Sequence, residues 1–172
     1  MNNSNYQSGT MVDKKIGWNT QTVVTLIICI AIPLIVGSIS AFLTQNAMMA
    51  FDSMNKPMLA PPAWLFPVAW TILYILMGVA SFLIYMSNHE ARYIGLLLYI
   101  GQLIFNFFWS LIFFRLNAYI FAAAWLTILL IMIIALIFNT AKYSKAAMCM
   151  LIPYAAWCCF AMYLNVGVAI LN

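Results

Sequence analysis

The residues that could do chemistry in this 172-residue chain are few, and their types favour binding over acid–base catalysis. Asp13, Asp52 and Glu90 are the only acids, and His89 is the only histidine. All four lie outside the long apolar stretches, so no serine or cysteine there has the base that nucleophilic catalysis requires. A proton-coupled transporter is disfavoured for the same reason, because such proteins carry an ionisable relay inside the membrane.

The four cysteines do not form a pattern that would hold a metal. Cys29 and Cys149 stand alone on apolar stretches, and no Cys-x-x-Cys pair occurs. Cys158 and Cys159 are adjacent, so on a helix they point to different sides. We interpret all four as small packing residues. We therefore expect neither a metal site nor a cofactor.

Aromatic and amide side chains recur at helical spacing on three apolar stretches. Spacings of three, four, seven and eight residues place such side chains on one face of a helix. An amide inside lipid is costly unless it faces protein or a cavity. The stripes are Trp70, Tyr74, Met77, Gly78 and Ser81; Gln102, Asn106 and Trp109; and Trp157, Phe160, Ala161, Leu164 and Asn165.

A helix rise of about 1.5 Å per residue brings the three stripes to one level, beneath the first loop. That loop carries Lys56 and three prolines, Pro57, Pro61 and Pro62, which stiffen it. A stiff lid over an aromatic, amide-bearing cavity suits a flat apolar ligand with a polar rim. The alternative interpretation is that the stripes only pack the bundle and that the amides hold helices together.

The composition identifies the environment of these elements. Hydrophobic residues make up 67% of the chain and charged residues 6%, and the mean hydropathy is +1.02. So few charges cannot cover a water-soluble globule, and so apolar a chain is not intrinsically disordered. The seven Lys and Arg residues are scattered and do not form the basic patch that nucleic-acid binding requires. The sequence therefore predicts an integral membrane protein whose partner is the lipid bilayer.

Five uncharged apolar stretches are long enough to span a bilayer as helices, which takes about 20 residues each. None alternates like a barrel strand. The first is longer than a signal-peptide core and follows a long polar segment, so we expect it to be retained. The prediction is an all-α bundle of five transmembrane helices, one membrane domain over residues 22–171 behind a polar segment 1–21. The spans are residues 22–43, 64–86, 93–114, 119–140 and 146–170, with a lid loop at 44–63.

The loop charges predict an orientation. Positive residues gather on the cytoplasmic side of membrane proteins. This predicts the N-terminus inside and the C-terminus outside, and a bacterial cytoplasmic membrane suits the pattern. Five positive residues share the side of the N-terminus, and two lie opposite: Lys14, Lys15, Arg92, Lys142 and Lys145 against Lys56 and Arg115.

Four collinear motifs resemble the TspO, or translocator protein, family of tryptophan-rich sensory proteins. The first-loop motif is Asn55-Lys56-Pro57 with Pro61-Pro62, and the second-span motif runs from Trp64 to Tyr74 as WLFPVAWTILY and continues to Met77-Gly78. The other two motifs lie on the third and fifth spans: Gly101-Gln102-Leu103, Asn106, Trp109 and Phe113-Phe114; and Pro153-Tyr154, Trp157, Phe160-Ala161 and Leu164-Asn165.

The resemblance implies a homodimer of five-helix bundles with a pocket open toward the first loop. Its implied ligands are porphyrins such as protoporphyrin IX, and isoquinoline carboxamide and benzodiazepine-type drugs. Residues matching Trp70, Trp157 and Ala161 line the pocket in such proteins, and those matching Asn106 and Trp109 lie near it. The two tryptophans are linked there to light-dependent porphyrin breakdown.

The chain also departs from the family pattern. Met58-Leu59 stands where many relatives carry a loop tryptophan, and Leu97 replaces the first glycine of a Gly-x-x-x-Gly pair ending at Gly101. No Lys or Arg follows Tyr163, so cholesterol is not an expected ligand.

Three hypotheses follow from the sequence. The favoured one is a tetrapyrrole-binding protein of sensory or transport type. The second is an enzyme that degrades porphyrin through Trp70 and Trp157, and the third is a structural membrane adaptor. The predicted ligand-binding residues are Trp70, Tyr74, Gln102, Asn106, Trp109, Trp157, Phe160, Ala161 and Asn165, beneath the lid residues Lys56, Pro57, Pro61 and Pro62.

Overall fold

A computed structural model describes residues 17–51 and 54–172, without the side chains of 46–51. The predictions made for residues 1–16, Asp52 and Ser53 lie outside this part. The predicted all-α class with five spans is confirmed, since each helix is long and apolar enough to cross a membrane. The helices are α1 (Thr20–Phe51), α2 (Leu65–Met86), α3 (Arg92–Ser110), α4 (Tyr119–Ala141) and α5 (Lys145–Leu171), with a π-helical turn (Leu111–Arg115) after α3.

The largest difference from the predicted spans is at the end of α1. The helix continues to Phe51 and so takes up residues 44–51 of the expected lid loop. Its last turns are rich in Ala, Met and Gln, which favour helix, and contain neither proline nor glycine to stop it. The loop before α2 is correspondingly short. The other helix ends lie within one or two residues of the predicted ones, once the π-helical turn is counted with α3.

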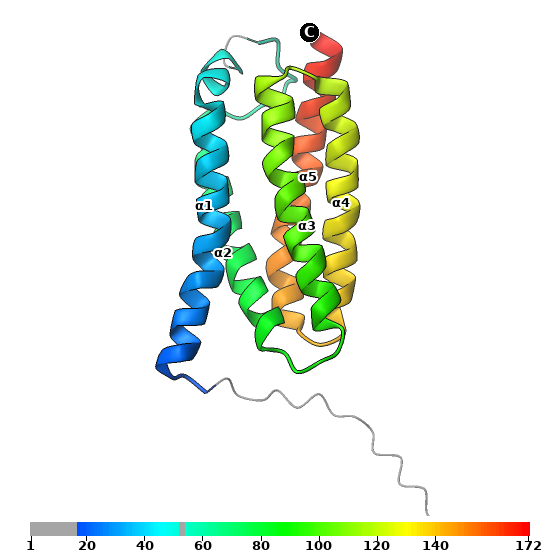
Figure 1. Cartoon of the computed structure of the whole chain (residues 1–172). Coiled ribbons are helices and arrows are strands. Elements are labelled where there is room, and N and C mark those ends of the chain that lie inside the picture. Colours follow the sequence, from blue (N-terminus) through cyan, green and yellow to red (C-terminus); the bar gives the residue numbers. More distant parts are fainter. Residues whose placement is uncertain (1–16, 52–53) are drawn as a thin grey trace, which may run out of the picture.

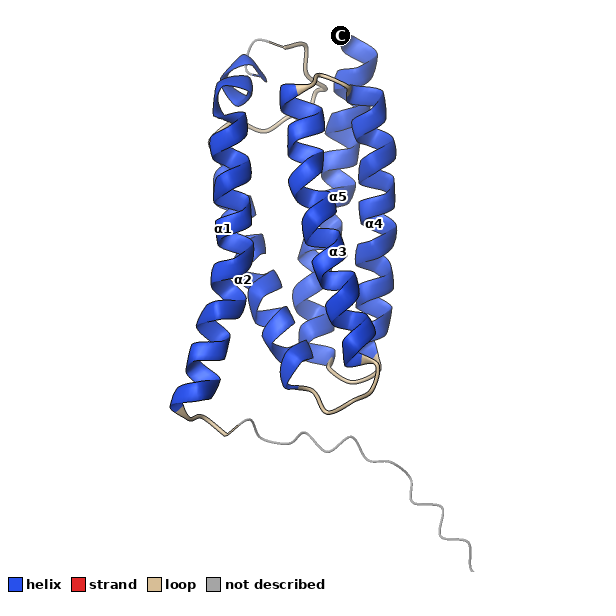
Figure 2. Cartoon of the chain, in the orientation of Figure 1, coloured by secondary structure: helices blue, strands red, loops and turns tan. Residues whose placement is uncertain are grey.

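The helices run up and down in a single bundle (Figures 1 and 2). The first loop, the α3–α4 connection and the C-terminus lie at one end, which we call the loop end. The α2–α3 and α4–α5 turns lie at the opposite end, together with the start of α1. Helix α1 is peripheral, because only 11% of its most apolar window is buried, against 28–44% for the other four.

Two glycines bring α1 and α2 together. A Cβ added at Gly78 would lie 2.5 Å from the Ile30 Cα and 2.8 Å from the Cys29 carbonyl oxygen, so only glycine permits this backbone approach. At Gly37, a side chain would run into the ring of Tyr74. The α1–α2 contact therefore depends on the absence of side chains at these two positions.

Candidate ligand-binding site

Trp70 of α2 lies at the centre of a cluster of aromatic rings in the loop half of the bundle. Its ring stacks on that of Tyr74, with centroids 5.4 Å apart and planes 28° apart. Three more rings lie against it, those of Trp109, Tyr154 and Trp157, with centroids at 6.5, 6.3 and 6.5 Å. The structure thus brings the predicted stripes of α2, α3 and α5 together around one indole.

The predicted amides Gln102 and Asn106 are buried and bind Tyr154, one of the rings that lie against Trp70. Asn106 Nδ2 donates to the Tyr154 hydroxyl at 3.0 Å, and that hydroxyl donates to Gln102 Oε1 at 2.8 Å. All three residues are buried. Gln102 Nε2 is left without a partner in the described part of the chain. The two amides therefore hold Tyr154, and through it α3 to α5, in place behind Trp70.

A second polar link joins α3, α4 and α5 nearer the loop end. Trp109 Nε1 donates to Asn165 Oδ1 at 3.2 Å, and Asn165 Nδ2 donates to the backbone oxygen of Tyr119 at 2.7 Å. Trp109 also stacks on Phe113, with centroids 5.6 Å apart, in the π-helical turn. Such turns widen a helix locally and often occur at functional sites. The predicted residues Trp109 and Asn165 therefore have fixed orientations.

A small cavity lies between Trp70 and α1. It measures about 80 Å³, whereas sites for drug-sized ligands are about 300–1,000 Å³. The hydroxyl of Ser40, which is 4% exposed, has no hydrogen-bond partner among the described residues. The lining residues are Gly37, Ser40, Ala41, Thr44, Phe66, Pro67, Trp70, Tyr74, Trp109, Ser110 and Phe114.

The predicted residues on α5 are divided between an outer groove, which Trp157 and Phe160 line, and the core, where Ala161 lies. Their rings lie 5.7 Å apart and line an apolar groove of about 510 Å³ between α2 and α5 on the outside of the bundle. Ala161 is buried in the core. Trp157 joins the two regions, because its ring contacts Trp70 on one side and faces the groove on the other.

The lid loop is tied to the end of α5. The backbone N–H of Asn55 donates to Asn172 Oδ1 at 3.3 Å, and Asn172 Nδ2 donates to the backbone oxygen of Asn55 at 2.9 Å. A Cβ at Gly167 would lie 2.7 Å from the ring of Pro57, so this glycine seats the proline against α5. Met58 and Leu59, which follow this proline, are both exposed, at 96% and 66%. Lys56 and Pro61 are partly buried and Pro62 is exposed.

The sequence interpretation missed the contribution of α1 and the role of Tyr154. Gly37, Ser40, Ala41 and Thr44 follow the helical spacing of one face, so a stripe of small residues was present as a signal. Tyr154 precedes Trp157 by three residues and Ala161 by seven, which places it on the stripe already identified on α5.

Comparison with known proteins agrees with the motifs. A model described as TspO/MBR family matches residues 29–171. The chain is 35% identical to the tryptophan-rich protein TspO of Chlorobaculum tepidum, over 87% of this chain and 97% of that protein. It is 32% identical to the tryptophan-rich sensory protein of Cereibacter sphaeroides (71% and 76% covered) and 33% identical to the human translocator protein (73% and 76% covered). The chain belongs to the TspO/MBR family.

Proposed function

We propose that this membrane protein binds tetrapyrroles, with protoporphyrin IX as the reference ligand, in the cluster around Trp70 and serves a sensory or regulatory role. The observation that carries the proposal is that the indole of Trp70 lines a cavity while rings of α2, α3 and α5 lie against it. Flat aromatic ligands bind aromatic rings by stacking. Isoquinoline carboxamide and benzodiazepine-type compounds, also flat and apolar, would use the same cavity.

The cavity as described is too small for such a ligand, and ligand binding must enlarge it. A cavity of about 80 Å³ holds only a few water molecules, each of which takes about 30 Å³ in the liquid. Helix α1 forms the wall that can yield, because it is the least buried helix. The closed and the ligand-filled forms would be the two states of a sensor.

Ser40 is a further candidate for a hydrogen bond to the ligand, beside the amides expected from the sequence. Gln102 Oε1, Asn106 and Asn165 already bind groups of the protein. Ser40 offers an unpaired hydroxyl at the cavity wall. We therefore propose Ser40 as the residue that meets a polar group at the ligand rim, while the amides position the rings behind Trp70.

The proposal also covers the orientation of the bundle in the membrane and its assembly into a homodimer. Arg92, Lys142 and Lys145 lie at the opposite end of the bundle, while Lys56 and Arg115 lie at the loop end. By the positive-inside rule the opposite end would be cytoplasmic and the binding site would lie in the outer half of the membrane, as in a bacterial cytoplasmic membrane. The homodimer implied by the resemblance stays a prediction.

The test is a titration of purified protein with protoporphyrin IX in the dark, followed by tryptophan fluorescence. Wild type and Trp70→Phe are compared with Trp18→Phe, which removes an exposed indole at the far end of α1. We expect saturable quenching in wild type and Trp18→Phe, and binding weaker by about twofold to tenfold in Trp70→Phe, since a stacked aromatic pair contributes about 0.5–1.5 kcal/mol beyond its buried area.

Linear quenching that is equal in all three proteins would contradict the proposal. It would mean that the porphyrin only partitions into detergent, and the aromatic cluster would then be packing alone.

A further inference from the structure

Aromatic rings in contact lead from Trp70 to the loop end of the bundle, and we call them the Tyr119 row. The ring centroid of Trp109 lies 6.5 Å from that of Trp70. Phe113 stands between Trp109 and Tyr119, at 5.6 Å from the first and 5.3 Å from the second. Trp109 and Phe113 are buried, whereas Tyr119 is half-buried at the start of α4. The row therefore joins the cavity wall to the loop-end surface through the core.

A row of this kind can transfer electrons. Tunnelling weakens exponentially with distance, so several short steps between oxidisable side chains are faster than one long step. Tryptophan and tyrosine are the aromatic side chains that lose an electron most readily, and Phe113 only bridges Trp109 and Tyr119. Trp109 Nε1 donates to Asn165 Oδ1, an amide oxygen that is not a base. An oxidised Trp109 therefore keeps its proton and remains strong enough to oxidise a tyrosine.

The position of Tyr119 decides where an electron deficit that starts at Trp70 can end. A tyrosine is oxidised at neutral pH only if its phenolic proton leaves. Tyr74 and Tyr154 lie against Trp70, but both are buried inside the bundle, and the Tyr154 proton faces an amide oxygen. The Tyr119 hydroxyl makes an exposed hydrogen bond, to Asn117 Oδ1 at 3.1 Å, in the loop end. Water there can accept the proton.

A second row of the same ring types starts from Trp70 and provides an internal comparison. Trp157 lies 6.5 Å from Trp70, Phe160 5.7 Å from Trp157, and Tyr163 6.2 Å from Phe160. Tyr163 is eight residues before Leu171, which at about 1.5 Å per residue is roughly 12 Å below the end of α5. Water is scarce at this depth in the hydrocarbon region. This Tyr163 row therefore ends where the phenolic proton cannot leave.

We propose that the Tyr119 row carries oxidising equivalents from a photoexcited porphyrin to the loop-end surface, an inference that rests on the proposed function. The excited porphyrin takes one electron from Trp70 and passes it to dissolved oxygen, which becomes superoxide. Trp70 regains an electron from Trp109, and Trp109 regains one from Tyr119, whose phenolic proton passes to water. The porphyrin and both tryptophans return to their starting states. A neutral tyrosyl radical remains at Tyr119, accessible to water-soluble reductants.

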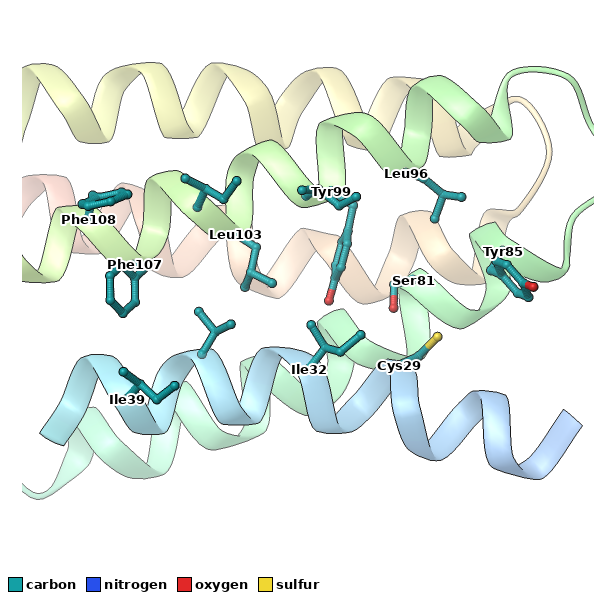
Figure 3. A pocket seen from close by; sticks show the side chains of 13 residues that line it. Cys29, Ile32, Ile39, Ser81, Tyr85, Leu96, Tyr99, Leu103, Phe107 and Phe108 are labelled. Carbon is teal, nitrogen blue, oxygen red and sulfur yellow. The ribbon is translucent and has the colours of Figure 1, made fainter. Parts of the chain in front are cut away.

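Tyr99 provides a control tyrosine outside both rows. Its ring extends from α3 into an apolar groove between α1 and α3, with the hydroxyl toward Ser81 and Cys29 (Figure 3). It is buried, and it is not one of the four rings that lie against Trp70. A radical that follows the Tyr119 row should therefore not depend on Tyr99.

The test creates an electron deficit next to Trp70 in two ways and identifies the freeze-trapped radical by EPR spectroscopy. In the first arm, protein loaded with protoporphyrin IX in the dark is illuminated in air. In the second arm, a ruthenium tris(bipyridine) label is attached to Pro67→Cys, which lines the same cavity, in a background whose native cysteines are replaced by alanine. Light and hexaammineruthenium(III) remove an electron from the label, which then takes one from Trp70 without any porphyrin.

We expect a tyrosyl signal in both arms, which ring-deuterated tyrosine narrows. Tyr119→Phe keeps the ring, so it should abolish this signal and leave a longer-lived tryptophan radical in its place. Trp109→Phe, which interrupts the row, should remove most of the tyrosyl signal. The matched variants Tyr163→Phe and Tyr99→Phe should keep the signal of wild type.

A tyrosyl signal that survives Tyr119→Phe, or one that disappears in Tyr163→Phe, would overturn the proposal. So would a ruthenium arm that yields only tryptophan radicals, because the row then does not conduct to Tyr119.

The two arms separate this inference from the proposed function. A Tyr119 radical in the ruthenium arm, without saturable binding of protoporphyrin IX in the dark, would confirm conduction and contradict the binding site. Saturable binding without a Tyr119 radical in either arm would do the reverse.

Discussion

The two walls of the Trp70 site are built differently. On the side of α3, α4 and α5, side chains of separate helices are joined by hydrogen bonds, through Tyr154 and through Asn165. On the side of α1, the contact consists of glycines against a ring and a backbone, beside the unpaired hydroxyl of Ser40 and a small cavity. A bonded wall keeps its geometry because its directional hydrogen bonds would break on moving. The half of α1 from Gly37 to Thr44 has no described hydrogen bond to another helix that would be lost if it shifted, whereas the half at Cys29 and Ile30 is packed tightly on Gly78.

Because of this difference, we expect the two walls to have different roles in ligand binding. Buried polar networks that are satisfied fix one arrangement of the helices they join. The α3–α5 wall would therefore present the aromatic faces in constant positions. Helix α1, exposed to lipid over most of its length, would move to admit a ligand. The predictions below test the two walls in turn.

The largest effect is expected at Gly78. In Gly78→Ala the new Cβ meets the backbone of Ile30 and Cys29, which cannot rotate away, so α1 must move off α2. We expect a loss of about 3 kcal/mol in the free energy of unfolding, at the upper end of the range for overpacked cores. Thermal unfolding in detergent measures it. The matched control is Gly101→Ala, whose Cβ meets only the flexible end of Met132 and should cost less than about 1 kcal/mol.

Tyr154→Phe tests the bonded wall. It removes a hydroxyl that accepts from Asn106 and donates to Gln102, leaving two buried amides short of a partner. We expect a loss of about 2 kcal/mol, since a buried polar group left unpaired costs about 1–3 kcal/mol. Combining the change with Gln102→Leu should restore part of the stability. A Tyr154→Phe protein as stable as wild type would show that the network is not what holds this wall.

Ser40→Ala should give the opposite result on the other wall. Its hydroxyl has no partner in the described structure, so removing it should leave stability unchanged or raise it by up to about 1 kcal/mol. Affinity for protoporphyrin IX should fall by about threefold to tenfold if the hydroxyl meets the ligand rim. Unfolding and dark titration of the same preparation measure both quantities. A variant that loses stability and keeps its affinity would remove Ser40 from the site.

The smallest effect is expected at Tyr143, in the α4–α5 turn, which donates to Asn139 Oδ1 at 2.8 Å and stacks on His89. Burial raises the pKa of Tyr143 to about 12, above its usual value of about 10. Its contribution to stability is therefore complete below about pH 10 and is lost as the pH rises toward 12.

This half-buried group should contribute less than about 1 kcal/mol. Unfolding curves between pH 9 and 12 should show a shallower decline for Tyr143→Phe than for wild type. An identical pH dependence of the unfolding free energy in the two proteins would contradict the assignment of this effect to Tyr143.

Helical spacing and hydropathy were enough to predict the five helices and the convergence of the aromatic stripes on Trp70. Both depend on local periodicity, which a sequence displays directly. The end of α1 was predicted too early, because the prediction ended the helix where its apolar stretch ends. A helix continues past that point when no proline or glycine stops it.

Partners of polar groups were harder to predict. Spacing placed Gln102 and Asn106 on the correct face, but it could not show that Tyr154 occupies both amides, because that depends on how three helices pack. The contribution of α1 to the site was missed because its stripe consists of small residues. Such residues line a cavity without filling it.

The central claim is that α1 moves while the α3–α5 wall stays in place. It is tested by spin-label distance measurements in a background whose native cysteines are replaced by alanine. One pair joins α1 to α5 (Phe42→Cys with Ile152→Cys), and the reference pair joins α4 to α5 (Phe121→Cys with Ile152→Cys), all at exposed positions. On adding protoporphyrin IX in the dark, the first distance should lengthen while the second stays constant. A ligand that binds saturably and changes neither distance, or both equally, would contradict the account.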